Sequence, residues 1–567
     1  MKKKHAEEKL TVKLPCNFSA DEILNPLRLR KDLHENLKAS MCYILDSYIN
    51  MLQNRIWREF YDEHGGLPLQ AEILNKIIGK NYNKAVNILI QNGIITRTRS
   101  YQAGKVAKLF SLTKEYKSSE FKTRTLSKDS SIYKRLLEYK TKKQDQNEAA
   151  LSKIYYITKW FDPQRLKLNK MLSHTLIEFY QLKLNGLISN SLPNDRSLEE
   201  INSRINHRAN SMIDTFNTVN KGEMRLRKTG KDKRLHSVVS CTKKELRGLY
   251  YYDDKKLGSV DLKTSQPYLI NILLNKDSWK KDGIISKSFP ELITYIQTCN
   301  YEERLSYLLM FGTFQGFSGY SSVKKPMFNQ FDWTSDFYSH LVYLAKAEGK
   351  ADIFPDRSTA KKKMMVILFN DKPYMDRDKS FLLFKKWFPY EAEMIIFLKK
   401  ISREAQIKSS NLMGFNILPI LLQRLESYLV LEKVCFKITQ ELPLAPIIPV
   451  HDCIMTTEEN LVEVANIFKN EMQKEIGIEP GLSVDTNSQV IDEVYLKSLV
   501  ETDFNEILDK KPKGLHQYSK LKLPISFDPP ELEGKTIIYS RYFESFNILD
   551  ESLNDENIFI LINDVKN

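Results

Sequence analysis

The sequence predicts an α+β protein, in which many helices accompany a few short strands. Apolar residues recur at helical spacing over long stretches, as at Leu33, Leu37 and Met41. Short apolar runs beside turn residues predict strands instead, such as one that ends near Asp261 and two that flank a turn at residues 451–452. The chain has 567 residues, 42% of them hydrophobic and 28% charged, so it can form packed cores in roughly three or four domains.

The composition favours a nucleic-acid partner. The chain has 86 Lys and Arg against 71 Asp and Glu, a net charge of +15 that suits a polyanion. None of its six cysteines forms a C-x-x-C pair, so neither disulfides nor a zinc site are indicated, and a reducing compartment is expected. No apolar stretch is long enough for a signal peptide or a membrane span, so we expect a cytoplasmic protein without a membrane partner.

The first 116 residues are expected to form a helical segment and a small DNA-binding domain. Residues 1–60 have helical periodicity. Residues 61–116 then predict two amphipathic helices, with apolar faces at 71–78 and 85–89, and a hairpin that returns at 109–112. Two short helices followed by a two-stranded wing form the layout of a winged helix.

The wing is basic, which favours a DNA-binding role. The second helix could enter a major groove while the wing contacts phosphates. A winged helix can also serve protein contacts or packing alone, and this alternative stays open. The wing residues expected to contact DNA are Arg97, Arg99, Lys105 and Lys108.

Residues 117–225 are expected to be polar, basic and helical, either as a thumb that grips a duplex or as a solvated bundle. Residues 204–247 contain 12 Lys and Arg against four Asp and Glu. A surface of this kind binds phosphates through counterion release, although a charge run is more often a solvated face.

Two aspartates carry the strongest sign of chemistry. Asp261 ends a predicted strand in the segment KKLGSVDLKTSQPYL, and Asp452 lies in the turn of PLAPIIPVHDCIMTT. A carboxylate at the end of an apolar strand is costly unless it is paired or binds a cation. Brought together, the two could hold two Mg²⁺ ions roughly 4 Å apart, which would activate a 3′-hydroxyl and stabilise a leaving pyrophosphate.

A basic helix is expected between the two aspartates. Asp356 can cap it, and Arg357, Lys361 and Phe369 then fall on one face because they are four and eight residues apart. Two cations and a ring on one face could bind the phosphates and the base of a nucleoside triphosphate.

In this order the segments resemble the family A DNA polymerases and the related phage-type single-subunit RNA polymerases. VDLKTSQPYL resembles their motif A, the helix from Arg357 to Asn370 their motif B, and VHDCI their motif C. The segments around residues 229–237, 386–389, 422–427 and 478–484 are similar to secondary conserved segments of the same families, in the same order.

The resemblance implies a role for each matching residue. Asp261, Asp452 and the backbone carbonyl of Leu262 would bind two Mg²⁺ ions. Arg357 and Lys361 would bind the triphosphate, with Lys361 also protonating the pyrophosphate. The remaining implied contacts are Phe369 beneath the new base pair, His451 and Gln423 near the primer terminus, and Arg234 near the duplex minor groove.

Two departures bear on sugar choice. Motif B usually ends in Tyr-Gly, but Phe369 and Asn370 stand there, which removes a hydroxyl that senses the ribose in the RNA branch. Met365 in the middle of motif B resembles that branch. Gln266 takes the place where the DNA branch has a bulky Glu that blocks a 2′-hydroxyl, and this favours deoxynucleotides.

The resemblance implies a right-hand polymerase, with an antiparallel palm and helical fingers in residues 226–495 and a thumb before them. With a winged helix at its N-terminus, such a protein suits the replication of a phage, plasmid or other mobile element. The tail at 496–567 has no recognisable motif. One alternative is a phage-type RNA polymerase or primase, and another is a non-catalytic winged-helix replication initiator or regulator.

Overall fold

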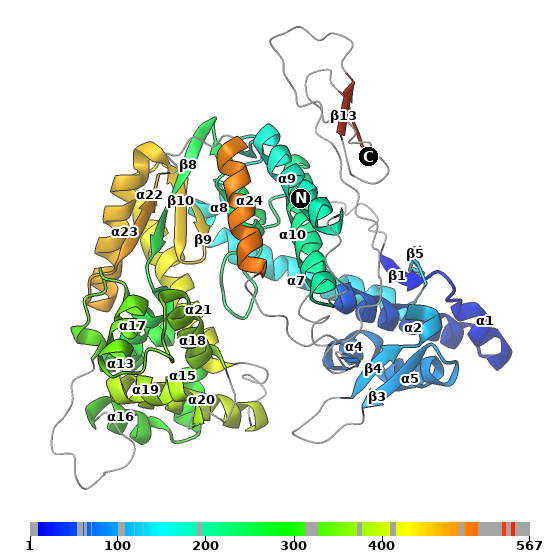
Figure 1. Cartoon of the computed structure of the whole chain (residues 1–567). Coiled ribbons are helices and arrows are strands. Elements are labelled where there is room, and N and C mark those ends of the chain that lie inside the picture. The colour runs from blue at the N-terminus through cyan, green and yellow to red at the C-terminus, as the bar shows by residue number, and fades with distance from the viewer. Residues whose placement is uncertain are drawn as a thin grey trace. The chain divides into compact units, whose positions relative to one another are not determined.

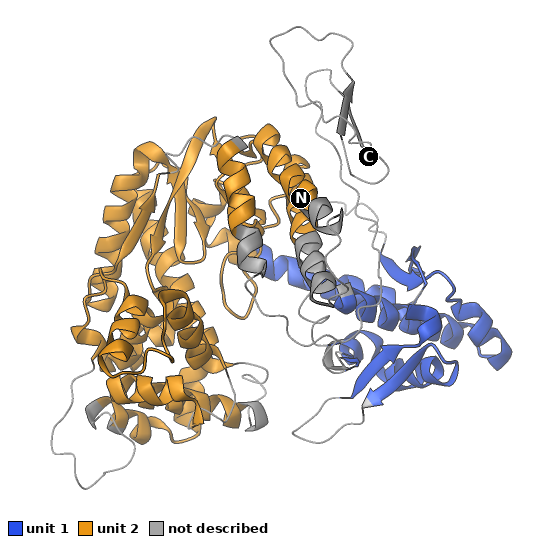
Figure 2. Cartoon of the chain, viewed as in Figure 1, with its two compact units in different colours: residues 1–148, 511–525 blue, residues 149–510, 526–567 orange. Residues whose placement is uncertain are grey.

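The computed structural model divides the chain into two compact units (Figures 1 and 2). Unit 1 comprises residues 1–148 and 511–525, and unit 2 comprises residues 149–510 and 526–567. The described residues are 10–53, 61, 65–69, 71–99, 108–117, 119–128, 130–189, 196–311, 327–370, 377–408, 416–486, 493–508, 536–539 and 546–549. Helices and antiparallel sheets are both present, which confirms the predicted α+β class.

Unit 1 contains a small three-stranded sheet covered by helices. Its elements are β1 (Thr11–Pro15), α1 (Ala20–Leu24), α2 (Lys31–Gln53), β2 (Leu67–Pro68), α4 (Ala71–Ile78), α5 (Tyr82–Gln91), β3 (Ile95–Arg99), β4 (Leu109–Leu112), α6 (Lys114–Lys117), β5 (Phe121–Thr125) and α7 (Ser131–Ser152). The sheet has the order β2-β4-β3. The expected helices and hairpin are present, and their apolar faces at Leu74, Ile77, Ala85, Ile88 and Leu89 are buried.

The N-terminal segment contains the expected helix, α2, but it begins with a strand. Residues 11–15 form β1, which pairs with β5 from Thr11↔Thr125 to Pro15↔Phe121. Leu10, Val12 and Leu14 are buried, and alternate residues are exposed, so a period of two applies here. Described apolar residues between Leu10 and Leu136 form one buried cluster, which extends across the boundaries that we had placed near residues 60 and 116.

Unit 2 is organised around an antiparallel sheet whose strands differ in length. Its strands are β6 (Leu166–Leu168), β7 (Tyr250–Tyr252), β8 (Lys255–Leu262), β9 (Ile448–Val450), β10 (Cys453–Thr457) and β11 (Leu482–Asp485). The order is β6-β7-β8-β10-β9, and β11 pairs with the other edge of β8. Strand β8 is therefore central, with β10 on one side and β11 on the other.

Helices surround this sheet in Figure 1. The helices before the central strand are α8 (Tyr155–Thr158), α9 (Lys170–Ser189), α10 (Arg196–Asn220), α11 (Val238–Cys241) and α12 (Lys244–Arg247). Those between β8 and β9 are α13 (Ser265–Leu274), α14 (Ile284–Ser288), α15 (Pro290–Thr298), α16 (Glu302–Phe311), α17 (Phe337–Ala347), α18 (Arg357–Phe369), α19 (Lys379–Trp387), α20 (Pro389–Lys408), α21 (Ile417–Ser427) and α22 (Cys435–Glu441). A π-helical segment, Tyr428–Val434, joins the last two.

The remaining elements are α23 (Leu461–Ile476), α24 (Glu493–Leu508), β12 (Thr536–Tyr539) and β13 (Phe546–Leu549). Helix α24 contacts α9 and α10, and its Leu496 and Val500 are buried in the core of unit 2. The start of the C-terminal tail therefore packs against the region from which we expected a thumb. Among the described residues, no helix is both long and apolar enough to cross a lipid bilayer.

A close backbone approach holds β11 beside the end of β8. The N–H of Lys263 donates to the carbonyl of Gly481 over 2.9 Å. A Cβ atom at position 481 would lie 2.3 Å from the carbonyl oxygen of Trp333, so only glycine fits there without a shift. This contact fixes the chain directly after the strand that ends with Asp261 and Leu262.

Candidate active site

The two expected metal ligands come together at one end of the sheet. Asp261 is the last residue but one of β8, and its register partner on β10 is Cys453, the residue after Asp452. The N–H of Leu262 donates to the carbonyl oxygen of Asp452 over 3.1 Å. The hydrogen-bonded register therefore places the two aspartates on adjacent strand ends.

The surroundings of Asp261 raise the pKa of its carboxyl group. Although the residue as a whole is exposed, burial of its carboxyl raises the pKa to about 6, and Asp452 contributes to the rise. Lys361 of α18 and Lys244 and Arg247 of α12 are near enough to oppose it. Acidic groups that repel each other among cations can bind a divalent cation together with an anionic ligand.

The donor set suits magnesium that is shared with a phosphate ligand. Mg²⁺ is usually held by one or two carboxylates, substrate phosphates and waters, and seldom by a cage of protein ligands. Among the described residues, no group of three or more His, Cys, Asp and Glu is placed to hold a metal ion. Asp261 and Asp452 could thus bind magnesium, with the Leu262 carbonyl as implied above, only if a substrate completed the coordination.

His451 forms the turn between β9 and β10 and has a left-handed backbone, with φ of 59°. Burial lowers the pKa of its imidazole to about 4, and Arg234 adds to the effect. The ring is therefore neutral near pH 7. It lies 6.1 Å from the ring of His236, centroid to centroid, in an edge-to-face arrangement.

Helix α18 begins as predicted from its sequence. The carboxylate of Asp356 accepts hydrogen bonds from the N–H of Thr359 at 2.8 Å and from its hydroxyl at 2.7 Å. The helix then places Arg357, Lys361 and Phe369 on one face. The two cations are exposed and the ring is half-buried, so this face is open to a ligand.

Arg357 has an internal partner that the sequence did not indicate. Its Nε lies 2.6 Å from Oδ2 of Asp336, the N-cap of α17, and its guanidinium lies 5.6 Å from the ring of Tyr338. Burial raises the pKa of Tyr338, and Asp452 contributes to the rise, so this cluster lies near the carboxylates. A triphosphate would have to compete with Asp336 for Arg357.

Two side chains hold the last carbonyl oxygens of α18. The buried ammonium of Lys399 on α20 donates to the carbonyl of Asn370, and Nδ2 of Asn416 donates to that of Phe369 over 3.1 Å. The end of the helix is thus fixed where the sequence has Phe-Asn in place of Tyr-Gly.

Glu426 on α21 joins three parts of the site. Its carboxylate accepts a hydrogen bond from Nε2 of Gln266 at 2.7 Å and pairs with the guanidinium of Arg234 at 2.6 Å. Glu426 is 1% exposed and Arg234 is 17% exposed. Burial raises the pKa of Glu426 while Arg234 opposes the rise, and Asp452 is near enough to contribute.

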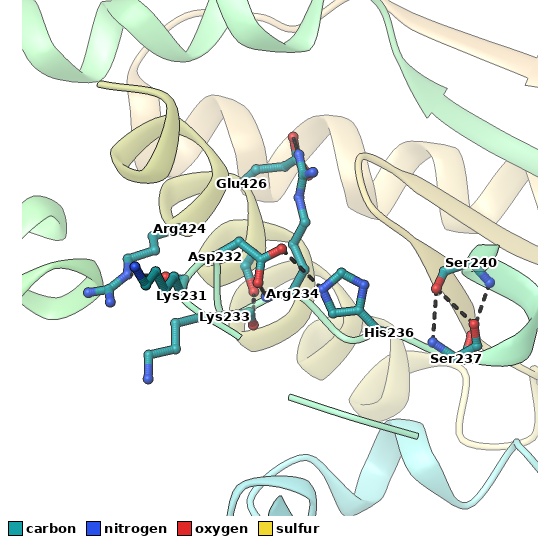
Figure 3. Close-up of polar contacts among 10 residues, drawn as sticks. Lys231, Asp232, Lys233, Arg234, His236, Ser237, Ser240, Arg424 and Glu426 are labelled. Carbon is teal, nitrogen blue, oxygen red and sulfur yellow. Dashed lines mark hydrogen bonds and ion pairs between the residues drawn. The ribbon is translucent and has the colours of Figure 1, made fainter. Parts of the chain in front are cut away.

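This arrangement changes the interpretation of Arg234, which the resemblance had placed near the minor groove. Figure 3 shows its side chain directed toward Glu426. A guanidinium with a buried partner can position a neighbouring segment more readily than it can contact DNA directly.

The loop that carries Arg234 is fastened to α21 at three points. Nε of Arg424 donates to the carbonyl of Lys231 at 2.7 Å, and the hydroxyl of Ser427 donates to that of Lys233 at 2.6 Å. Arg234 and Glu426 form the third contact (Figure 3). The exposed side chain of Lys233 points away from Glu426, so a basic group of this loop remains at the surface.

Several buried polar atoms beside the carboxylates have no hydrogen-bond partner in the described part of the chain. They include Oε1 of Gln266, Oγ1 of Thr264 and Nδ1 of His451. Buried polar atoms are almost always satisfied in folded proteins. These three atoms lie on segments adjoining Asp261 and Asp452, where a polar ligand could satisfy them.

The other predicted residues lie as follows. Gln423 is half-exposed on α21, one turn before Glu426. Arg97 and Lys108 are exposed in unit 1, and Arg99 belongs to β3 with a side chain outside the described residues. Lys105 lies outside the described residues altogether.

Sequence reasoning missed three contributors to the site. Lys244 and Arg247 lie in the basic stretch 204–247, so their charge was visible but their proximity to Asp261 was not. Glu426 lies in the predicted segment 422–427, but its contact with Gln266 joins positions 160 residues apart. No local pattern carries a contact of that range.

Comparison of the sequence with models of known protein families finds no matching family, and comparison with curated proteins finds no matching relative.

Proposed function

We propose that this protein is a template-dependent DNA polymerase that extends a 3′-hydroxyl with deoxynucleoside triphosphates. The observation that carries the proposal is the register that sets Asp261 beside Asp452 at adjacent strand ends. Of the few reactions served by two carboxylates and shared divalent cations, nucleotidyl transfer also needs a triphosphate site. The cationic face of α18, which reaches Asp261 through Lys361, could provide one.

Each residue of the site would have a separate role in the reaction. Asp261 and Asp452 would hold two Mg²⁺ ions, which supply activation of the attacking hydroxyl and stabilisation of the leaving group when bound. Lys361 would neutralise the triphosphate and give a proton to the departing pyrophosphate. Arg357 would leave Asp336 to bind a phosphate, and Phe369 would stack beneath the new base pair.

Sugar selection would fall to Gln266. The residue is buried, and Glu426 fixes the direction of its amide by the 2.7 Å hydrogen bond. A fixed side chain at this position leaves less room for a 2′-hydroxyl than a mobile one. The Arg234–Glu426 pair would then support selectivity indirectly, by holding Gln266 in place.

Unit 1 would dock the enzyme on duplex DNA. This role is supported by the order of elements, which resembles that of a winged helix: helix α2, strand β2, helices α4 and α5, and hairpin β3–β4, with the sheet order β2-β4-β3. The exposed cations Arg97 and Lys108 suit phosphate contacts.

A phage-type RNA polymerase or primase is the second candidate. It is favoured by Met365, which resembles the RNA branch in the middle of motif B, whereas Phe369 lacks the hydroxyl that senses the ribose in that branch.

Primer extension distinguishes these candidates. A primed single-stranded DNA template is incubated with magnesium and either dNTPs or NTPs, beside an unprimed reaction and the Asp452→Ala variant. We expect extension with dNTPs that disappears in the variant. Unprimed product from NTPs would indicate the RNA enzyme instead. If no lane yields product while duplex binding persists, the protein is a binding factor and the polymerase proposal fails.

A further inference from the structure

The exposed face of α5 in unit 1 carries a row of side-chain amides. Asn83, Asn87 and Gln91 are four residues apart, so they lie along one side of the helix. All three are exposed. The opposite side faces the core of unit 1 through the buried residues Tyr82, Ala85, Val86, Ile88 and Leu89.

The three amides are free of polar contacts to the described part of the chain. Among the described residues, none of the three makes a hydrogen bond to another residue. The neighbouring Asn92 behaves differently, because its Nδ2 donates to the carbonyl of Ile88 over 2.9 Å and ends the helix. The row thus keeps its donors and acceptors available to a ligand.

The segment that carries the row has only positive charges. Residues 73–114 contain eight Lys and Arg and no Asp or Glu. Lys80, Lys84 and Arg97 are exposed within that stretch. Exposed cations of this kind can bind the phosphates of a polyanion.

We propose that Asn83, Asn87 and Gln91 read adenines in the major groove of duplex DNA, so that unit 1 selects a sequence. This inference rests on the proposed docking of unit 1 on DNA and adds base recognition to it. A carboxamide offers one donor and one acceptor side by side. Adenine presents the matching pair, the N7 acceptor and the N6 donor, only in the major groove.

The dimensions agree with this mode of recognition. The row extends over about 12 Å of helix, since each residue rises 1.5 Å. That length covers about three or four base pairs in a groove that admits an α-helix. The deep, narrow major groove of A-form RNA would exclude it.

Selection from random duplexes tests the proposal with the full-length protein. Bound DNA is recovered at physiological salt and sequenced. We expect enrichment of two or three adenines within a segment of about four base pairs. The variant Asn83→Ala/Asn87→Ala/Gln91→Ala should lose this enrichment and bind the selected site at least tenfold more weakly, with nearly unchanged affinity for unrelated duplex.

Two controls isolate base reading from phosphate binding. Lys84→Ala/Arg97→Ala should weaken binding to all duplexes and reduce its salt dependence, while the enriched sequence stays the same. Replacing the selected adenines by 7-deazaadenine removes N7 and keeps base pairing, so it should abolish the preference. The substituted amides are exposed, and an unchanged melting temperature of the triple variant would show that it folds.

Duplex binding without enrichment, or an enriched sequence that survives in the triple variant or with 7-deazaadenine, would overturn the inference and leave docking intact. Equal competition by duplex RNA would also overturn it. If the protein binds no duplex DNA at all, the docking role fails with it.

Discussion

The acidity of Asp261 depends on the neighbouring Asp452. Asp261 is hard to ionise because partial burial of its carboxyl and the neighbouring Asp452 both raise its pKa, and the cations Lys361, Lys244 and Arg247 offset only part of that rise. Glu426 is a second buried carboxyl nearby, but it already has Arg234 and Gln266 as partners. Asp261 and Asp452 are thus available to a ligand, whereas Glu426 holds Arg234 and Gln266 in place.

Asp261→Asn should change how stability depends on pH. The pKa of Asp261 is raised from 3.8 to about 6, so the folded protein keeps a proton that the unfolded chain releases. The stabilisation of the folded protein by this proton is complete below pH 3.8, and it is lost as the pH rises through 6. In magnesium-free buffer, the melting temperature of the variant relative to wild type should therefore rise between about pH 4 and pH 7. Calorimetric melting at several pH values measures this, and a constant difference would contradict the assigned environment.

Glu426→Ala should lower the free energy of unfolding by about 3 kcal/mol or more, because Arg234 would stay in a mostly buried position without its carboxylate. Urea denaturation measures the change. Glu459→Ala is the matched control, since it breaks the exposed pair with Lys255 and should have little effect. Similar effects of the two substitutions would mean that the buried pair does not organise the site.

At the scale of elements, helix α18 connects the triphosphate face to the rest of unit 2. Its start was predictable, because Asp356 followed by a run of helix formers is a local signal. Strand β8, the β9–β10 hairpin, α4, α5 and the β3–β4 hairpin were also predictable from local patterns. The end of α18 was not, since Lys399 and Asn416 come from distant segments.

Lys399→Met should loosen the last turn of α18. The substitution keeps much of the apolar side chain but removes the charged donor to the Asn370 carbonyl. Backbone amides near Phe369 should exchange hydrogen faster, and the KM for nucleotide should rise more than kcat falls. Hydrogen-exchange mass spectrometry and steady-state kinetics measure these effects. Unchanged exchange in this turn would show that the lysine is not what holds it.

At the scale of the whole molecule, the chain consists of two units with separate cores. Sequence patterns predicted the α+β class but placed the boundaries differently. The pairing of β1 with β5 closes unit 1 across more than 100 residues, and α24 joins the core of unit 2 from beyond the predicted palm. Pairings of this range depend on tertiary packing, which local periodicity does not record.

The separate core of unit 1 predicts that residues 1–148 fold when expressed alone. The fragment should unfold cooperatively and bind duplex DNA with an affinity that falls steeply with salt, because its exposed cations would contact phosphates. Circular dichroism and fluorescence titration measure both properties. An unfolded fragment would show that unit 1 depends on the rest of the chain.

The central claim is that Asp261 and Asp452 form the catalytic centre of a polymerase, and a single-turnover measurement tests it most directly. Incorporation of one dNTP into a saturating primer–template is timed for wild type, Asp261→Asn, Asp452→Asn and the exposed control Asp282→Asn, with DNA affinity measured on the same samples. Both site variants should lose about a thousandfold or more in rate, since each removes several kcal/mol of transition-state stabilisation. DNA affinity should stay nearly constant, and the control should match wild type. Near-normal incorporation by either site variant would contradict the assignment.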